Sequence, residues 1–103
     1  MFEWDETKNQ ANIEKHGVSF VTASRIFEGV VFSVIDDSRD YGETREISIG
    51  RIGGAIFLTV VHTDRDGNIR IISERPAKRG ERHRYEEAIR EGNDRGRSGG
   101  GEG

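Results

Sequence analysis

The sequence predicts an α+β domain in which an antiparallel β-meander packs against helices, with the elements in the order β-α-α-β-β-β-β-α. Helical patterns occupy residues 8–28, β-branched and aromatic runs follow between residues 30 and 75, and a basic helical pattern begins near residue 78. Short turns between consecutive strands favour antiparallel pairing. The apolar stripe of Phe20 and Phe27 must bury against one face of this sheet.

The chain begins with one strand and one helix. Residues 2–5 alternate apolar and polar side chains, which is typical of a strand. A helix over residues 8–16 is capped by Asp5 or Thr7, and Gly17 ends it.

A second helix is expected from Ser19, which is a good N-cap residue, to Gly29. Its apolar residues recur with the spacing of one helix face. This spacing predicts a buried stripe of Phe20, Ala23, Ser24 and Phe27.

Four strands and a final helix follow. The strands are expected at residues 30–35, 44–51, 55–63 and 68–75, joined by a polar loop, a Gly53-Gly54 hairpin and a turn at residues 64–67. The third of these strands is the most apolar and is expected to be central. Pro76 ends strand pairing because it has no N–H to donate. A helix over residues 78–91 completes the domain.

Composition predicts one domain followed by a tail. The 103 residues are 32% hydrophobic, a low value for a packed domain. Residues 92–103 contain no apolar side chain and are rich in glycine. We therefore expect a single domain over residues 1–91 and a disordered tail over residues 92–103.

Several classes of protein are excluded by what the chain lacks. It has no cysteine, so disulfides and thiolate chemistry are impossible. The acidic N-terminus does not resemble a signal peptide, and the apolar runs are too short to span a bilayer. We expect a cytoplasmic protein with no membrane contact.

Charge is segregated along the chain although the net charge is only −3. Residues 1–46 hold 5 Lys/Arg and 10 Asp/Glu, net −5, whereas residues 70–90 hold 7 Lys/Arg and 4 Asp/Glu, net +3. Guanidinium groups pair with phosphate oxygens in bidentate fashion. The strand and helix around residues 70–90 are therefore expected to face an anionic partner.

A set of short motifs carries a resemblance to a known family. The matching residues are Phe2 to Asp5, Lys8, Asn12, Lys15 to Phe20, Glu43, Arg45, Gly50, Arg51, Val60 to Thr63, Ile69 to Ser73, Arg75, Ala77, Arg79, Glu81 and Tyr85. In order and spacing they resemble the BrnT toxin family over residues 1 to about 87. The resemblance implies a fold similar to RelE-type toxins and an endoribonuclease activity that inhibits translation. It also implies a partner antitoxin, BrnA, and contact with operator DNA only through the antitoxin complex.

RNA cleavage by the 2′-hydroxyl needs a base, cations that stabilise the phosphorane, and assistance to the leaving oxygen. The three histidines are dispersed at positions 16, 62 and 83, and no paired carboxylates are spaced for a metal, so no metal or cofactor is expected. With the resemblance, the candidate catalytic residues are Arg75, Arg79, His62 and Arg70. The candidate RNA-phosphate-binding residues are Lys8, His16, Lys78 and Arg82.

Each candidate also has a structural interpretation. Arg70 and Arg75 are an odd number of residues apart, so an ideal strand places them on opposite faces unless a bulge intervenes. His62 ends an apolar strand, where a structural histidine is common. His16 complements the helix dipole in a last turn, and residues such as Lys78 and Arg82 fit a solvated helix face.

This chain differs from the family pattern at Glu74, Pro76 and Gly80. Glu74 is expected to place a negative charge beside Arg75, and Gly80 to interrupt the last helix. One alternative is therefore a catalytically weak protein that only binds its antitoxin. Another is a DNA-binding helix-turn-helix formed by residues 8–16 and 19–28, although the N-terminal half is acidic.

Overall fold

A computed structural model describes the secondary structure of residues 1–37 and 39–98, and the surroundings of side chains as far as Gly92. It confirms the α+β class. The elements, in chain order, are β1 (Phe2–Trp4), α1 (Glu6–His16), α2 (Phe20–Ala23), a 3₁₀ helix η1 (Ser24–Glu28), β2 (Phe32–Asp36), β3 (Arg45–Ile52), β4 (Ile56–Arg65), β5 (Asn68–Pro76) and α3 (Arg79–Ser98).

The five strands form one sheet in the order β1-β5-β4-β3-β2, with β4 at its centre as predicted. Strands β2 to β5 make the expected antiparallel meander. The first strand corrects the prediction, because β1 pairs with β5 in parallel and the sheet is mixed. Parallel strands need a long connection, and the chain between β1 and β5 supplies one. The pattern of a three-residue strand cannot reveal this pairing.

Local signals at the two N-terminal helices are confirmed. The Asp5 side chain accepts hydrogen bonds from the backbone of Thr7 and Lys8, and Gly17 ends α1 with φ of 74°, in the left-handed region that favours glycine. The Ser19 side chain caps α2 by accepting from a backbone N–H.

The main core lies between the sheet and the helices α1, α2 and η1. Phe20, Ala23 and Ile26 are fully buried, and Phe27, which we expected in the buried stripe, is partly buried against the same core. Ile26 therefore joins the expected residues at the centre of this core. The cause is the 3₁₀ turn after Ala23, because a helix with three residues per turn brings position i+3 back to the same side. A Cβ added at Gly50 of β3 would lie 2.7 Å from the Ile26 Cβ, so glycine there allows η1 to approach the sheet.

This arrangement does not fit a helix-turn-helix. The second helix has four α-helical residues before the 3₁₀ turn, and its buried side chains face the sheet. A recognition helix must be long and exposed to enter the major groove.

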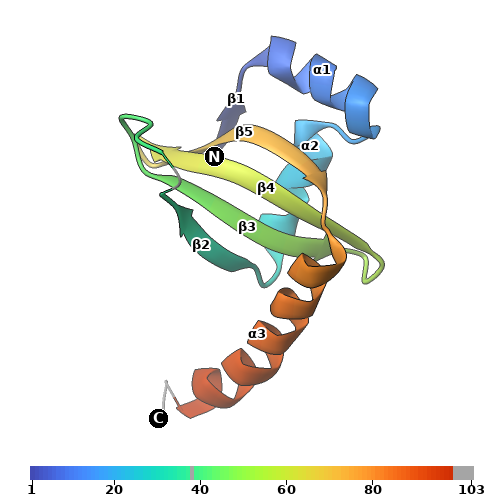
Figure 1. Cartoon of the computed structure of the whole chain (residues 1–103), viewed down its shortest axis with the longest axis vertical. Coiled ribbons are helices and arrows are strands. Elements are labelled where there is room, and N and C mark those ends of the chain that lie inside the picture. Colours follow the sequence, from blue (N-terminus) through green and yellow to red (C-terminus); the bar gives the residue numbers. More distant parts are fainter. Residues whose placement is uncertain (38, 99–103) are drawn as a thin grey trace.

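The opposite face of the sheet is covered at one end by α3. Ile49, Phe57 and Tyr85 form a second buried cluster there, and the Tyr85 hydroxyl donates to the Val30 carbonyl at 2.9 Å. Figure 1 shows α3 beginning where β5 ends and leading away from the sheet, while α2 passes behind the strands. The sheet therefore has one face closed by the N-terminal helices and one face that is open beside α3.

The last helix is longer than predicted. It runs to Ser98 rather than to Glu91, and so enters the segment that we expected to be disordered. Each residue that extends a formed helix loses its own conformational freedom and gains one hydrogen bond. Extension therefore costs far less free energy than nucleation, which orders several residues for one hydrogen bond. Gly80 does not interrupt α3 because it lies in the first turn, beside open space. The division into a domain of residues 1–91 and a tail stays a prediction, and residues 99–103 lie outside the described residues.

Candidate functional site

The junction of β5 and α3 is built by a short connection that stays attached to the sheet. The Ala77 N–H donates to the Phe57 carbonyl at 2.9 Å, directly after the last residue of β5. The Lys78 N–H then donates to the Glu81 carboxylate at 2.8 Å, and the Lys78 carbonyl accepts from the Arg82 N–H. Lys78 therefore occupies the N-cap position, and Glu81 supplies the carboxylate half of a capping box.

Arg75 at the end of β5 is held by this same carboxylate. Its Nη1 and Nη2 atoms donate to the two oxygens of Glu81 at 2.8 and 2.7 Å. The buried Thr59 hydroxyl donates to Glu81 at 3.0 Å. The hydrogen bonds from Arg75 lower the pKa of Glu81 to about 2 and, in turn, raise the pKa of Arg75. The pair is therefore a fixed, fully charged unit at the start of α3.

A bulge places Arg70 and Arg75 on one face of the sheet. Arg75 pairs with Thr59 and Arg70 with Thr63, and the register shifts by one residue between them. Directly opposed residues share a face, so both arginines project to the open face beside α3. Their partners on β4 are four residues apart, so at a rise of about 3.3 Å per residue the two arginines remain about 13 Å apart. Arg70 also pairs with Glu3 at 3.1 Å.

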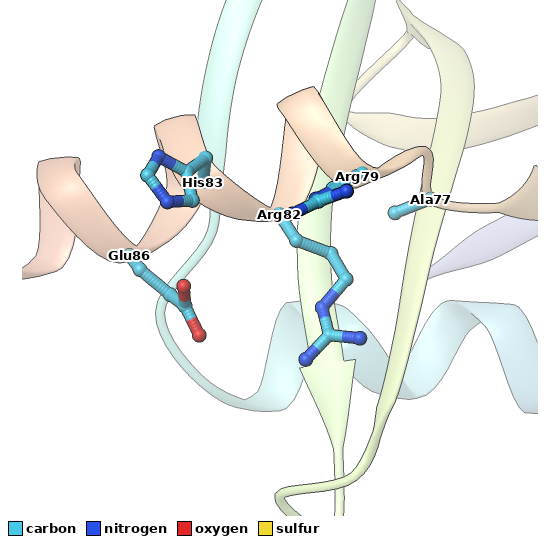
Figure 2. Close-up of a pocket in the computed structure, with 5 residues that line it drawn as sticks. All are labelled: Ala77, Arg79, Arg82, His83 and Glu86. Atoms are coloured by element: carbon cyan, nitrogen blue, oxygen red, sulfur yellow. The ribbon is translucent and has the colours of Figure 1, made fainter.

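The outer side of α3 carries a second group of cations. Arg79, Arg82, His83 and Glu86 line, with Ala77, an open hollow of about 570 Å³ (Figure 2). The Arg82 guanidinium carbon lies 4.2 Å from the centroid of the Phe57 ring, so this arginine is packed as well as solvated.

Arg75 and Arg79 lie on different sides of α3. Successive helical residues turn by about 100°, so Arg79 and the Glu81 that holds Arg75 project to opposite sides of the first turn. Arg75 is not part of the hollow. The structure thus brings Lys78, Arg79 and Arg82 to the start of α3 and places Arg75 across that turn.

His62 lies on the closed face of the sheet, apart from these arginines. Its side chain is buried, its Nε2 atom is 2.7 Å from the Ser48 hydroxyl, and its ring packs edge-on against Phe27. Burial lowers the pKa of His62. These contacts match the structural interpretation of this histidine.

Lys8 and His16 are also remote from the junction. Both lie on α1, which packs against the closed face, where its Asn12 contacts Glu74 of β5. His16 stands in the last turn of α1, where its positive form complements the helix dipole. The structure therefore separates these two residues, and His62, from the cations at α3.

We expected Glu74 to place its negative charge beside Arg75, but the structure places Glu74 on the other face of the sheet. It is paired with Val60 of the main core and projects to the closed face, where its side chain is 2% exposed and accepts a hydrogen bond from Asn12. Burial raises the pKa of Glu74 to about 7. The carboxylate that meets Arg75 is Glu81 instead, which joins the strand end to the helix start.

Sequence reasoning missed Glu81, Thr59 and His83 as members of the site. The available signal was an arginine at a strand end followed six residues later by a glutamate in a helix's first turn. Within the described part of the chain, no three His, Asp or Glu side chains are grouped to hold a metal ion. No helix among the described residues is long and apolar enough to cross a membrane.

The fold and the site define a small α+β protein with arginines gathered where the last strand of its sheet meets a helix. A family model described as "Ribonuclease toxin, BrnT, of type II toxin-antitoxin system" matches residues 4–81. The chain belongs to this BrnT family of ribonuclease toxins.

A solved structure supports the same assignment. The crystal structure of the Brucella abortus ribonuclease toxin BrnT, at 1.1 Å resolution, is 30% identical in sequence, with a TM-score of 0.56. The similarity covers 77% of this chain and 99% of that one. Among the curated proteins that were compared, none matches this chain. Family membership implies an RNA substrate and an antitoxin partner.

Proposed function

We propose that this protein is an endoribonuclease that cleaves RNA without a metal ion, through attack of a 2′-hydroxyl on the adjacent phosphate. The observation that carries the proposal is the first turn of α3, which has Arg75 fixed on one side and Arg79 and Arg82 around a hollow on the other. Guanidinium groups placed at a phosphate stabilise the charge of the phosphorane. The cationic side chains can therefore supply the role that a metal has in other nucleases.

The RNA strand crosses the first turn of α3 in this proposal. One phosphate lies at Arg75 on the open face, and the following phosphates lie at Arg79, Lys78 and Arg82. The N-terminus of a 20-residue helix favours anions there as well, because its first N–H groups and its dipole are positive.

His83 is the preferred acceptor for the 2′ proton. Histidine is the residue that most often transfers protons in catalysis, and His83 lines the same hollow as Arg79 and Arg82. His62 was the candidate from sequence, but its contacts on the closed face keep it from a phosphate at α3. Glu86 beside His83 is a second group of a type that accepts a proton.

The partner in this proposal is a BrnA-type antitoxin that covers the cationic surface around Arg75 and Arg79. Occupying the phosphate site is the simplest way to silence a ribonuclease. Operator DNA is then contacted through the antitoxin complex, and cleavage of cytoplasmic RNA inhibits translation. The proposal also includes a RelE-like fold, supported by the meander sheet with a helix following its last strand.

The test is cleavage of single-stranded RNA by purified protein in excess chelator. We expect cleavage to persist, and Arg75→Ala and Arg79→Ala each to lower its rate by about 10-fold to 100-fold, the effect of losing a charge-assisted hydrogen bond. The exposed Lys15 on α1 provides a matched charge control, and Lys15→Ala should cleave normally. Activity that vanishes in chelator and returns with magnesium contradicts the proposal.

A further inference from the structure

The hydrogen bonds of Arg75 leave one edge of its guanidinium group unused. Nη1 donates to Glu81 and to the Pro76 carbonyl, and Nη2 donates once to Glu81. A guanidinium group has five N–H donors. Two remain, one on Nε and one on Nη2, and within the described part of the chain neither meets an acceptor.

These two donors point in the same direction. Nε and Nη2 form the side edge of the planar group, and this edge matches two oxygens of a phosphate. The Arg75 side chain is 37% exposed, so a ligand on the open face can reach part of it. Arg75 can thus keep its ion pair with Glu81 while it binds a phosphate in bidentate fashion.

Glu81 is itself fixed from two further directions. The buried Thr59 hydroxyl donates to it from β4, and the Lys78 N–H donates to it from the helix start. The positive end of the helix dipole stabilises a carboxylate at this position. Glu81 is therefore held by both β4 and the start of α3, and its hydrogen bonds to Arg75 fix the guanidinium plane relative to them.

We propose that Glu81 is a positioning residue for RNA, because it holds the Nη1–Nη2 edge of Arg75 and so directs the Nε–Nη2 edge to a phosphate. The proposal rests on the ribonuclease function proposed above. It differs from the opposite role, in which the Glu81 carboxylate competes with RNA and keeps Arg75 occupied. The two roles predict opposite effects of removing the carboxylate.

The experiment compares Glu81→Gln and Arg75→Lys with the natural protein. Glutamine keeps the size of Glu81 but lacks the charge and one acceptor, and lysine can pair with Glu81 but has no second edge for phosphate. We expect kcat for RNA cleavage to fall by about 10-fold to 100-fold in both variants, with a smaller change in KM. Melting temperature is measured alongside, because a purely structural role would move stability rather than kcat.

Glu43→Gln is the matched control. Glu43 pairs with Arg45 and Arg65 away from α3, so the variant loses arginine–carboxylate pairs without touching the junction. Its cleavage rate should equal that of the natural protein. A second measurement is fluorescence anisotropy with a 2′-O-methyl RNA, which cannot be cleaved, and Arg75→Lys should weaken this binding by about 10-fold.

The outcomes separate the positioning role from the proposed function. Cleavage at the natural rate in Glu81→Gln or Arg75→Lys overturns the positioning role and leaves the ribonuclease function in place. Faster cleavage in Glu81→Gln also overturns it, in favour of competition. If the natural protein does not cleave RNA, the proposed function fails, and the anisotropy of Arg75→Lys still decides whether the free edge binds phosphate.

Discussion

Replacing Glu74 with glutamine should stabilise this protein at neutral and alkaline pH. Glu74 is 2% exposed, and one of its oxygens has no hydrogen-bond partner among the described residues. Burial without a cation disfavours its charged form and raises its pKa from 4.5 to about 7. Between these values the folded state holds a proton that the unfolded state has released, so stability falls as the pH rises from about 4.5 to about 7.

The magnitude follows from the shift in pKa. A difference of about 2.5 units, at about 1.36 kcal/mol per unit, makes the full penalty about 3 kcal/mol above pH 7. Glutamine resembles the protonated form in shape and carries no charge. Glu74→Gln should therefore gain about 1–3 kcal/mol of unfolding free energy at pH 8 and less than about 1 kcal/mol at pH 5.

Urea denaturation at the two pH values measures this gain, provided that the m-value is the same for the variant and the natural protein. Glu14→Gln on the exposed side of α1 is the control and should change stability by less than about 0.5 kcal/mol at either pH. An equal effect of Glu74→Gln at pH 5 and pH 8 would refute the reasoning. So would a loss of stability at pH 8.

Three further predictions concern packing, the partner and the tail. Gly50→Ala should destabilise the fold by about 1–3 kcal/mol, measured by urea denaturation, because its Cβ would meet Ile26 at 2.7 Å; a neutral result means that η1 can shift. Arg75→Ala and Arg79→Ala should weaken antitoxin binding by roughly one to two decades in a calorimetric titration, and unchanged affinity in both places the antitoxin on another face. Truncation after Glu91 should leave the melting temperature unchanged within error, and a drop of several degrees would show that the end of α3 contributes to stability.

Local features of this fold were predictable because they depend on neighbouring residues. The caps at Asp5, Gly17 and Ser19 each need one side chain or one backbone conformation, and the sequence contains it. The Gly53-Gly54 hairpin is equally local, since both glycines have positive φ. The central position of β4 followed from its apolar composition.

Features that depend on distant contacts were not predictable in the same way. The parallel pairing joins β1 and β5, the first and last strands in the chain. The alternating pattern of three residues does not indicate whether a strand pairs in parallel or antiparallel fashion. The bulge in β5 decides that Arg70 and Arg75 share a face, and no turn residue marks it. The same strand sends Glu74 to the closed face, where Asn12 of α1 meets it.

The candidate site was predicted in part. A cationic strand and helix around Arg75 and Arg79 followed from charge and from the family resemblance. The partner of Arg75 did not, because Glu81 reaches it only through the connection between β5 and α3. From sequence we chose His62 and His16 and left out His83, although only His83 lines the hollow with Arg79 and Arg82. The distance of each histidine from the arginines depends on the face or element that carries it, which the sequence pattern does not reveal.

The chemical ends of the RNA fragments test the central claim most directly. Attack by the 2′-hydroxyl leaves a 2′,3′-cyclic phosphate and a 5′-hydroxyl, and it needs the ribose hydroxyl at the cleaved position. We predict these ends in excess chelator, loss of cleavage when that one nucleotide is changed to its 2′-deoxy form, and a slower reaction in Arg75→Ala. Fragments with 3′-hydroxyl and 5′-phosphate ends, formed only with added magnesium and at an equal rate in Arg75→Ala, would contradict the account.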